Sequence, residues 1–320
     1  MSRAEVLIPH HNRAEGLRRT LESLRAQTLP ASVCVIDNAS TDDTPDVLAS
    51  FPDVRCLRLD RNAGFGAAVN RGARSSEADL IILLNNDAVA DSRFVERLVG
   101  AQRASGAEMV AGCLREPGGR IDSLGVQLDC SLLAYDHLHG AEYDALPAEV
   151  DAPLAPSGGA CAYLRDAFLS VGGFDEAIFA YLEDAELGLR MRKEGMRCVA
   201  APGAFAWHEH SGTLGARSAA KNELLGRSRA YLLWKHGGTL GARERARGAL
   251  VDATVAVGKL AIDHDLGMVR GYLRSWREQR GERRPAPELA TLEHVPLARF
   301  GLREALRRRL ARRSPEAPSP

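Results

Sequence analysis

Three residues with side-chain oxygens, Asn85, Asn86 and Asp87, come directly after an apolar run at residues 80–84. Such a run is typical of a short strand that is buried on both faces of a parallel sheet. In an open α/β sheet, ligands bind beyond the carboxyl ends of the strands. A carboxylate held there could bind a hard divalent cation and the phosphates that accompany it. Asn and Asp are also common in turns, so a plain strand-to-loop turn is the alternative.

Two earlier segments predict polar groups at the same edge. Asp37 ends a second apolar run, residues 33–36. A carboxylate there could accept hydrogen bonds from a base or a ribose, and helix capping or turn formation is the alternative. Gly64 and Gly66 open the helix after the third strand, where glycines let the backbone approach a phosphate. The segment does not fit the dinucleotide-binding fingerprint, because Val69 stands where the third glycine belongs.

Two downstream positions add groups for acid–base and metal chemistry. Glu183 and Asp184 begin a predicted helix, whose N-terminal partial charge stabilises carboxylates, so a structural role is one interpretation. A carboxylate fixed at a helix start and facing a crevice also meets the requirements of a general base. His208 follows a tryptophan in a predicted loop. Alone, such a histidine is more often a surface or core residue than a ligand.

The elements that must position these residues alternate between strand and helix. Four strands are predicted before residue 90, at residues 6–8, 33–36, 54–59 and 80–84. With helices between them, they indicate an α/β fold with a mainly parallel sheet flanked by helices and right-handed crossovers. Pro9 is expected to close the first strand. Residues 114–156 have no clear period and are interpreted as a meander or flap over the binding edge of the sheet.

The last third of the chain differs in character. Residues 216–236 and 243–280 are predicted to be helical, with arginines beside apolar and aromatic residues. From residue 215 onward the chain has 22 Lys and Arg against 11 Asp and Glu, and the preceding part has 20 against 31. The predicted division is an α/β domain at 1–214, a basic helical extension at 215–306 and a disordered tail at 307–320.

Composition places the chain among soluble globular proteins. Its 320 residues are 45% hydrophobic and 26% charged, with a formal net charge of zero. The six cysteines form no C-x-x-C pair and are interpreted as reduced thiols in the cytoplasm. No signal-peptide run and no apolar run of about 18 residues is present. The basic extension indicates an anionic partner. Three interpretations of these helices are left open: contact with a membrane face, a dimer interface and an ordinary packed subdomain.

Taken together, the motifs resemble those of family 2 glycosyltransferases with the GT-A (nucleotide-diphospho-sugar transferase) fold, in the branch that contains rhamnosyltransferases. The matching segments follow the family's order over residues 5–213: Ile8-Pro9, Asn12-Arg13, Val35 to Asp42, Asn62 to Gly66, Asn70 to Gly72, Leu84 to Asp87, Gly158 to Ala160, Gly172 to Glu176, Glu183-Asp184, Leu187, Arg190 and His208. Each segment is short, and the ordered series carries the resemblance.

The resemblance implies a role for several of these positions. Donor binding is implied for Pro9, Asn12, Asp37, Asn62, Gly64, Asn70 and Asn86. A place near the acceptor and the sugars is implied for Gly158, Gly159, Ala160 and Glu183. Asp184 would be the catalytic base, and Asp87 and His208 would be metal ligands. Asn85 replaces the first acid of the family's D-x-D element, so the choice between Mn²⁺ and Mg²⁺ stays open, and an imidazole ligand would favour Mn²⁺.

The implied activity is inverting transfer of a sugar from a dTDP- or UDP-linked donor to a hydroxyl of a glycan or lipid-linked acceptor, in cell-envelope or polysaccharide synthesis. Rhamnose or a similar deoxysugar is expected from the branch alone. The expected location is the cytoplasm, with peripheral contact on the inner face of the cell membrane through the basic helices. No nucleic-acid partner is expected, and an oligomer is left open. The alternatives are a non-catalytic GT-A scaffold that binds nucleotide sugars and a dinucleotide-dependent oxidoreductase.

Overall fold

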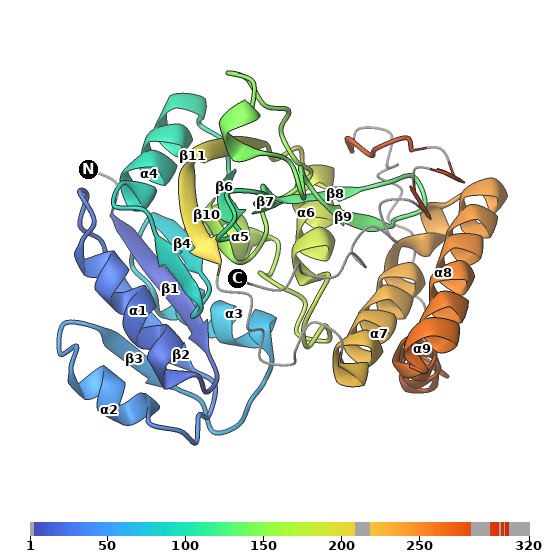
Figure 1. The fold of residues 1–320 in the computed structure, drawn as a ribbon, viewed down its shortest axis with the longest axis horizontal. Coiled ribbons are helices and arrows are strands. Elements are labelled where there is room, and N and C mark those ends of the chain that lie inside the picture. Colours follow the sequence, from blue (N-terminus) through green and yellow to red (C-terminus); the bar gives the residue numbers. More distant parts are fainter. Residues whose placement is uncertain (1–2, 209–217, 283–294, 301, 304, 307–320) are drawn as a thin grey trace.

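A mixed nine-stranded sheet forms the centre of the molecule in the computed structural model (Figure 1). Eight strands lie in the order β3–β2–β1–β4–β10–β6–β11–β5, and β7 pairs with β6. Their bounds are β1 Ala4–His10, β2 Ser32–Asp37, β3 Arg55–Arg58, β4 Leu80–Leu84, β5 Ala88–Ala90, β6 Met109–Arg115, β7 Ile121–Ser123, β10 Ala160–Leu164 and β11 Cys198–His208. The structure describes residues 3–208, 218–282, 295–300, 302–303 and 305–306.

The N-terminal half of the sheet is parallel. β2 pairs in parallel with both β3 and β1, and β1 pairs in parallel with β4. β10 runs antiparallel to β4 and β6, whereas β11 is parallel to β6. Because β10 reverses direction between two strands of the same sense, β1, β2, β3, β4, β6 and β11 all end at one edge. We call this the carboxyl edge of the sheet.

β1 runs through Pro9 to His10, so the prediction that Pro9 closes the strand is wrong. The carbonyl of His10 accepts a hydrogen bond from the N–H of Asn38, on the β2 side. Successive residues of a strand point their backbone groups to opposite sides, so Pro9 faces β4. Pairing with β4 ends at Leu7. The missing N–H of Pro9 therefore removes no ladder hydrogen bond.

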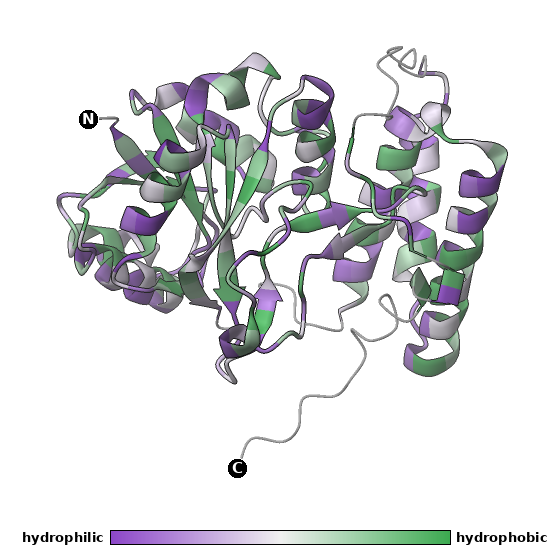
Figure 2. Cartoon of the chain, turned by 90° about the horizontal axis from the view of Figure 1, so that it is seen from above, coloured by the Kyte–Doolittle hydropathy of each residue, from purple (hydrophilic) through white to green (hydrophobic). Residues whose placement is uncertain are grey.

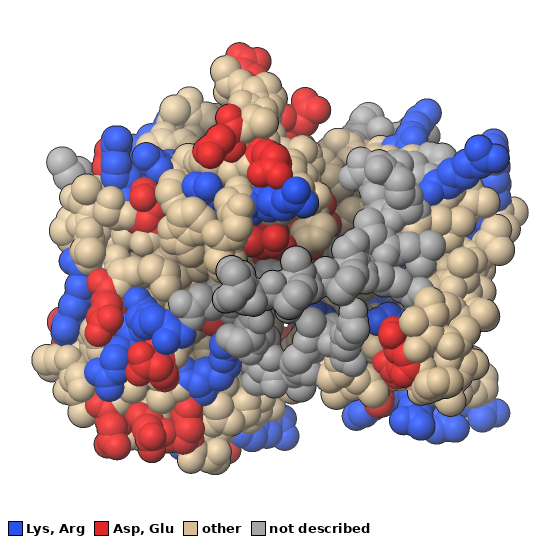
Figure 3. Space-filling view, in the orientation of Figure 1, with Lys and Arg blue, Asp and Glu red and all other residues tan. Residues whose placement is uncertain are grey.

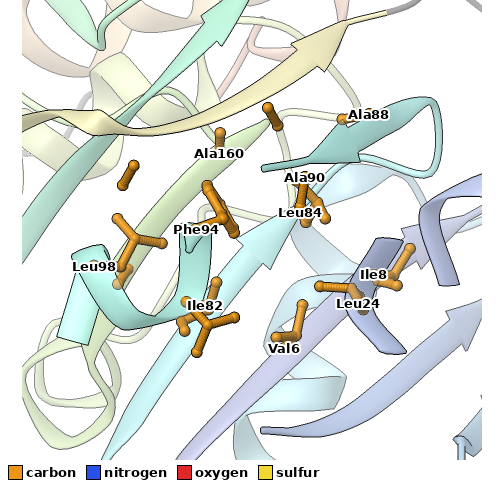
Figure 4. Packing of buried hydrophobic residues seen from close by; sticks show 14 of the residues in the cluster. Val6, Ile8, Leu24, Ile82, Leu84, Ala88, Ala90, Phe94, Leu98 and Ala160 are labelled. Atoms are coloured by element: carbon orange, nitrogen blue, oxygen red, sulfur yellow. The ribbon is translucent and has the colours of Figure 1, made fainter. Parts of the chain in front are cut away.

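Helices cover both faces of the sheet (Figure 1). One face packs against α1 Ala14–Arg25, α2 Thr44–Ala49 and α4 Phe94–Ser105. Leu17, Leu21 and Leu24 repeat at helical spacing along α1 and are buried against this face. Figure 4 shows the packing, with Val6 and Ile8 of β1 and Ile82 and Leu84 of β4 near Leu24, Phe94 and Leu98. The other face packs against α3 Phe65–Ser75, α5 Arg165–Ser170 and α6 Glu183–Lys193.

A short meander connects the sheet to the C-terminal helices. It contains β7, the separate two-stranded ribbon of β8 Val126–Leu128 and β9 Ala134–Asp136, and the 3-10 turn η1 Tyr143–Ala145. Leu128 and Leu132 of this region share a core cluster with Leu189 of α6 and Leu232. The meander therefore packs against both α6 and the C-terminal helices.

The C-terminal part contains α7 Ala219–His236, the 3-10 turn η2 Gly237–Thr239, α8 Ala242–Asp263 and α9 Gly267–Glu278. The predicted helix at 243–280 is two helices, separated at His264, which has a left-handed φ of 48°. α7 and α9 approach closely at glycines: a Cβ on Gly271 would lie 2.0 Å from the carbonyl oxygen of Glu223. Among the described helices, none combines the length and apolar character needed to cross a bilayer.

Candidate active site

The carboxyl edge of the sheet gathers most of the predicted functional residues. Asp37 ends β2, the turn at residues 85–87 follows β4, and His208 ends β11. Gly158 and Gly159 precede the antiparallel strand β10, whose first residue pairs with Leu84 at the end of β4. Strand direction alone therefore brings together residues that are up to 171 positions apart in the sequence, Asp37 and His208.

The turn after β4 is fixed by hydrogen bonds to two neighbouring segments and by close packing against a third. The N–H of Asn85 donates to the carbonyl of Gly159 at 3.0 Å, and its own carbonyl accepts the N–H of Ala88 at 3.2 Å. The side chain of Asn86 donates to Nδ1 of His10 at 2.8 Å. Below the turn, a Cβ on Gly16 would lie 2.9 Å from the carbonyl oxygen of Asn86. These contacts therefore hold Asp87 in a fixed position.

Asp87 is 8% exposed and lies between two cationic side chains. Its Oδ2 accepts a hydrogen bond from Arg13 at 2.7 Å, and its Oδ1 lies 3.3 Å from Nε2 of His208. Burial alone would raise the pKa of Asp87, but hydrogen bonds and charge from His208 and Arg13 hold it below its usual value. The group is therefore a carboxylate at neutral pH.

Asp122, in β7, orients His208. Its carboxylate lies 2.8 Å from Nδ1 of His208, on the side of the ring away from Asp87. Burial would lower the pKa of His208, but the hydrogen bonds to Asp122 and Asp87 outweigh it and raise the pKa to about 9. Sequence reasoning missed Asp122, because a single Asp in a segment without a clear period carries no signal for a partner 86 residues away.

Asp87 and His208 present atoms that could bind one divalent cation, provided that the cation displaces the proton on Nε2 of His208. Oδ1 of Asp87 and Nε2 of His208 converge at 3.3 Å, and the second ring nitrogen of His208 is held by a carboxylate, as is usual for metal-binding histidines. A second group lies beside them: Glu116, Asp122 and His139 each bring one ligand atom within 4.8 Å of the others. Asp122 belongs to both groups.

Glu183 and Asp184 form the first turn of α6, where Glu183 is buried and Asp184 is partly buried. The N–H groups of Ala185, at 2.7 Å, and Gly158 donate to the Asp184 carboxylate. Burial raises the pKa of Asp184, and these N–H groups offset part of the effect. Burial, followed by the charge of Asp184, raises the pKa of Glu183. Oε2 of Glu183 is enclosed by the protein and makes no hydrogen bond within the described part of the chain.

Residues with left-handed backbone stand just before α6, which begins with Glu183 and Asp184, and just before α1. Tyr181 and Leu182, just before Glu183, have φ values of 67° and 69°, and Asn12 and Arg13, just before α1, have 58° and 68°. Left-handed φ costs an ordinary residue about 1–2 kcal/mol. Such strain persists only where the surrounding structure imposes it, and it is concentrated at functional sites.

Gly158 and Gly159 connect Asp184 to the turn that carries Asp87. The N–H of Gly158 binds the Asp184 carboxylate, and the carbonyl of Gly159 binds the N–H of Asn85. Neither glycine leaves room for a side chain: a Cβ would lie 2.8 Å from the Phe65 ring at Gly158 and 2.7 Å from Leu114 at Gly159. Ala160 follows them as the first, fully buried residue of β10. The catalytic and metal-binding candidates therefore share one rigid frame.

Asp37 is 1% exposed and is engaged within the protein. Its Oδ2 pairs with Arg58, and its Oδ1 accepts the N–H of Ser40 at 2.8 Å. Asn38, next to it, donates to the carbonyl of Gly64 at 3.0 Å. Asp37 thus ties the loop after β2 to the end of β3. A contact between Asp37 and a nucleotide stays a prediction, and Arg58 and Asn38 are neighbours of Asp37 that sequence reasoning did not single out.

Asn12 and Asn62 lie in loops at the same edge. Oδ1 of Asn12 accepts the N–H of Thr41 at 2.9 Å, so Asn12 connects the loops after β1 and β2. Asn62 is exposed, and its side chain bonds only the N–H of Gly64, at 3.1 Å, among the hydrogen bonds of the described residues. Pro9 is partly buried one residue before the end of β1. Their predicted contacts with a donor are untested.

Gly64 and Asn70 make close contacts within the protein, and their predicted role in donor binding stays a prediction. We expected Gly64 to let the backbone approach a phosphate, but the group that approaches it is Phe179: a Cβ on Gly64 would lie 2.4 Å from the Phe179 carbonyl oxygen. Asn70 is 1% exposed, and its amide bonds both the N–H and the carbonyl of Phe174, each at 2.8 Å. Both residues therefore hold the segment before α6 against α3, and through it they position Glu183 and Asp184.

The site combines two kinds of chemistry. A carboxylate and an imidazole can hold a cation, and a partly buried carboxylate with a raised pKa can accept a proton. Both lie at one sheet edge with a firm backbone between them. This arrangement is suited to a displacement in which one hydroxyl loses a proton while a phosphate group departs.

Comparisons with known proteins agree with this chemistry. The family model described as "Glycosyl transferase family 2" matches residues 5–168. The N-acetylglucosaminyl-diphospho-decaprenol L-rhamnosyltransferase of Mycobacterium tuberculosis is 32% identical over 230 residues, which cover 64% of this chain and 75% of that protein. A mannosyltransferase from Pyrobaculum calidifontis, solved with GDP-Man and Mn²⁺, has a TM-score of 0.54 at 16% identity and covers 88% of this chain and 76% of its own. GalNAc-T7, solved with UDP, GalNAc and Mn²⁺, has a TM-score of 0.60 at 15% identity, with coverage of 89% and 57%.

Proposed function

The chain belongs to glycosyl transferase family 2, and we propose that it moves a sugar from a nucleotide-diphosphate donor to a hydroxyl of a glycan or lipid-linked acceptor. The observation that carries this proposal is the arrangement of Asp87 with His208, and of Asp184, on one rigid frame at the carboxyl edge. The family match sets aside the oxidoreductase alternative. The described fold agrees with the GT-A fold that the sequence predicted.

We propose a single displacement that inverts the anomeric centre, with Asp184 as the base. The acceptor hydroxyl attacks the anomeric carbon and its proton passes to Asp184, while the bond from that carbon to the donor's phosphate oxygen breaks. The N–H groups of Gly158 and Ala185 fix the carboxylate in place. Glu183, the neighbouring residue, is proposed to lie beside the acceptor, as the family resemblance implies. Gly158, Gly159 and Ala160 would form the wall beside the two sugars.

The raised pKa of Asp184 predicts an acid limb in the pH profile. Only the ionised carboxylate can accept a proton. Because its pKa is raised, Asp184 becomes protonated at a higher pH than an ordinary aspartate, whose pKa is near 3.9. We expect kcat/KM to fall as the pH is lowered from neutral into the mildly acidic range. The measurement is a pH series with donor and acceptor held well below their KM values. A rate that stays constant down to about pH 4.5 would contradict the assignment.

We propose that Asp87 and His208 hold Mn²⁺ or Mg²⁺, with Mn²⁺ favoured by the imidazole ligand. The cation would neutralise negative charge on the diphosphate leaving group. Arg13, bonded to Asp87, adds positive charge at the same place. Two structural neighbours were solved with Mn²⁺, which supports the choice of ion.

Asp122 is proposed as a positioning residue for His208. In Asp122→Asn the ring loses its carboxylate partner, and we expect Mn²⁺ affinity and kcat to drop about 10- to 100-fold, the usual effect of losing such a partner. The measurement is Mn²⁺ titration followed by electron paramagnetic resonance, beside rate assays. Asp144→Asn, an exposed change in the same meander, is the matched control. His139→Ala distinguishes the second group: if it weakens Mn²⁺ binding as much, Glu116, Asp122 and His139 form the metal site instead.

Donor identity rests on the relative that transfers L-rhamnose. We propose a dTDP- or UDP-linked donor, with rhamnose or a similar deoxysugar as the first candidate. The donor would contact Pro9, Asn12, Asp37, Asn62 and Asn86, whereas Gly64 and Asn70 would act through the backbone they hold. A thermal-shift screen of nucleotide sugars with Mn²⁺ and Mg²⁺ tests this, because a ligand that binds the folded state raises the melting temperature. The absence of any metal-dependent shift would refute donor binding.

We propose that the α/β domain spans residues 1–214, that the helical extension spans 215–306, and that the extension contacts the inner face of the cell membrane. Large apolar side chains on α8 and α9 face solvent, including Val257 at 65%, Ile262 at 67% and Trp276 at 60% exposure. Figure 2 shows hydrophobic stretches on these helices on the side away from the sheet. Figure 3 shows Lys and Arg side chains near both ends of this part of the molecule, where they could meet anionic lipids.

Removing two of these apolar side chains should weaken membrane binding. We expect the double variant Ile262→Ser/Trp276→Ser to bind anionic phosphatidylglycerol vesicles at least about tenfold more weakly, because burying one large apolar side chain is worth about 1.5–3 kcal/mol. Vesicle flotation measures the bound fraction. Leu302→Ser, the same kind of change at an exposed residue outside α8 and α9, is the control. Equal flotation of the double variant and the unchanged protein would exclude this face as the contact.

A further inference from the structure

A cavity of about 490 Å³ lies between the three C-terminal helices, away from the carboxyl edge. Its volume falls in the range of roughly 300–1,000 Å³ that is usual for small-molecule sites. The wall is mostly apolar and draws on every one of these helices and on η2. Representative lining residues are Leu233, Leu240, Ala253, Ala256, Met268 and Val269.

Three of the polar residues that line the cavity bind one another. Asp252 accepts hydrogen bonds from Nε of Arg229, at 3.1 Å, and from the hydroxyl of Tyr272, at 2.8 Å. The remaining guanidinium nitrogens of Arg229 donate to the carbonyls of Ser131 and Leu132. A polar ligand would find these groups already paired. The wall is therefore suited to a ligand that is itself apolar along most of its length.

The cavity opens onto the exposed apolar surface of α8 and α9. Val269 and Ala253 line the cavity and are also exposed to solvent. Arg245 is an exposed member of the lining, and no described residue forms an ion pair with it. An apolar interior with an available guanidinium at its border matches a hydrocarbon chain that ends in a phosphate.

α7 lies between this cavity and the catalytic segment. Arg229 faces the cavity, whereas the preceding residue, Ser228, donates to the carbonyl of Ala180 at 3.0 Å. On the same side of α7, the hydroxyl of Tyr231 donates to Asp175 at 2.9 Å. The segment that leads into Asp184 is thus separated from the cavity by one helix, which is about 10–12 Å in diameter.

From these observations we infer that the cavity between α7, α8 and α9 seats the hydrocarbon chain of a lipid-linked acceptor. The inference rests on the proposed function and adds where the acceptor's lipid part binds. Arg245 contacts the phosphate of the lipid, and the sugar end reaches past α7 to Asp184. A hydrocarbon chain bound in this cavity passes from the membrane into the protein and contacts apolar groups along the whole way.

The test is binding of farnesyl phosphate, a short prenyl phosphate, to the full chain without donor or metal. Ala256→Phe fills the cavity and Ala253→Phe narrows its mouth, and Ala261→Phe places the same ring on α8 outside the cavity. We expect both cavity variants to bind farnesyl phosphate at least about tenfold more weakly than the unchanged protein, because the chain loses buried methylenes. Ala261→Phe should bind normally, and circular dichroism should show all three folded.

Several results would overturn the inference. One is that the unchanged protein does not bind farnesyl phosphate, and another is equal affinity in the cavity variants and Ala261→Phe. Inorganic phosphate competing as well as farnesyl phosphate would show that the chain is not recognised. Sedimentation that shows Ala256→Phe dissociating a dimer, with farnesyl phosphate binding unchanged, would assign the face to a second copy. Nucleotide-sugar binding is measured on the same variants, so failure of the proposed function appears there and not in the prenyl phosphate titration.

Discussion

Replacement of Asp184 by asparagine is expected to abolish sugar transfer while donor binding persists. The amide keeps the size of the carboxylate and can still accept the N–H groups of Gly158 and Ala185, but it cannot take a proton. Loss of a general base typically lowers the rate about 10²- to 10⁴-fold. The measurement is kcat with saturating donor and acceptor, together with nucleotide-sugar affinity by calorimetry. We expect kcat to fall by that amount and the affinity to change less than about threefold.

Two controls separate the base from its surroundings. Asp166→Asn changes a carboxylate whose side chain is 96% exposed and should leave the rate unchanged. Glu183→Gln changes the neighbouring buried carboxylate, and we expect it to raise the KM for the acceptor more than it lowers kcat, because Glu183 is proposed to bind the acceptor. If Asp184→Asn retains near-normal transfer, or if Glu183→Gln has the larger effect on kcat, Asp184 is not the base.

Replacement of Asp87 by alanine is expected to remove activity and metal-dependent nucleotide binding together. Asp87 supplies the carboxylate of the proposed cation site, and its loss also leaves Arg13 and His208 without their shared partner. We expect kcat/KM to fall at least about 10³-fold, because charge on the leaving diphosphate would no longer be neutralised. The measurement is nucleoside-diphosphate affinity with Mn²⁺ and with EDTA, beside the transfer rate.

The nucleotide measurement distinguishes a metal site from a structural ion pair. In the unchanged protein, Mn²⁺ should strengthen nucleoside-diphosphate binding, and in Asp87→Ala that gain should disappear. Asp91→Ala is a suitable control, because Asp91 pairs with Arg97 in the same part of the chain and lies outside the proposed site. Asp87 holds no cation if the unchanged protein and a folded Asp87→Ala protein both bind nucleotide equally well with and without Mn²⁺.

Much of the fold was predictable because its first half obeys local rules. The apolar runs at residues 33–36 and 80–84 form β2 and β4, and the alternation with helices predicted the parallel N-terminal half of the sheet. The later strands were harder. β11 has no continuous apolar run, because Pro202 and Gly203 interrupt it, and its register shifts between Ala200 and Phe205. β5, three residues long, gave no recognisable pattern.

The candidate site was predictable in its positions and less so in its contacts. Asp37 and Asp87 were expected at one edge because strand ends meet there, and the structure places them there. His208 was predicted in a loop, but it is the last residue of β11 and reaches the same edge. The partners of Asn70 and Gly64 come from residues 174–179, more than 100 positions away, so no local pattern could show that these two residues hold the segment before Asp184. Asp122 was missed for the same reason: its role depends on a hairpin that folds back beside β6.

The most direct test of glycosyl transfer at this site is one coupled measurement on the unchanged full chain. A panel of dTDP- and UDP-sugars, with dTDP-rhamnose first, is incubated with Mn²⁺ and a prenyl-diphosphate-linked N-acetylglucosamine, the acceptor class named for the mycobacterial relative. Released nucleoside diphosphate and glycosylated acceptor are quantified together. We predict that one donor yields both products in equal amounts and that EDTA stops the reaction. If no donor in the panel yields a glycosylated acceptor, while the protein is folded and the acceptor is intact, the proposed function is contradicted.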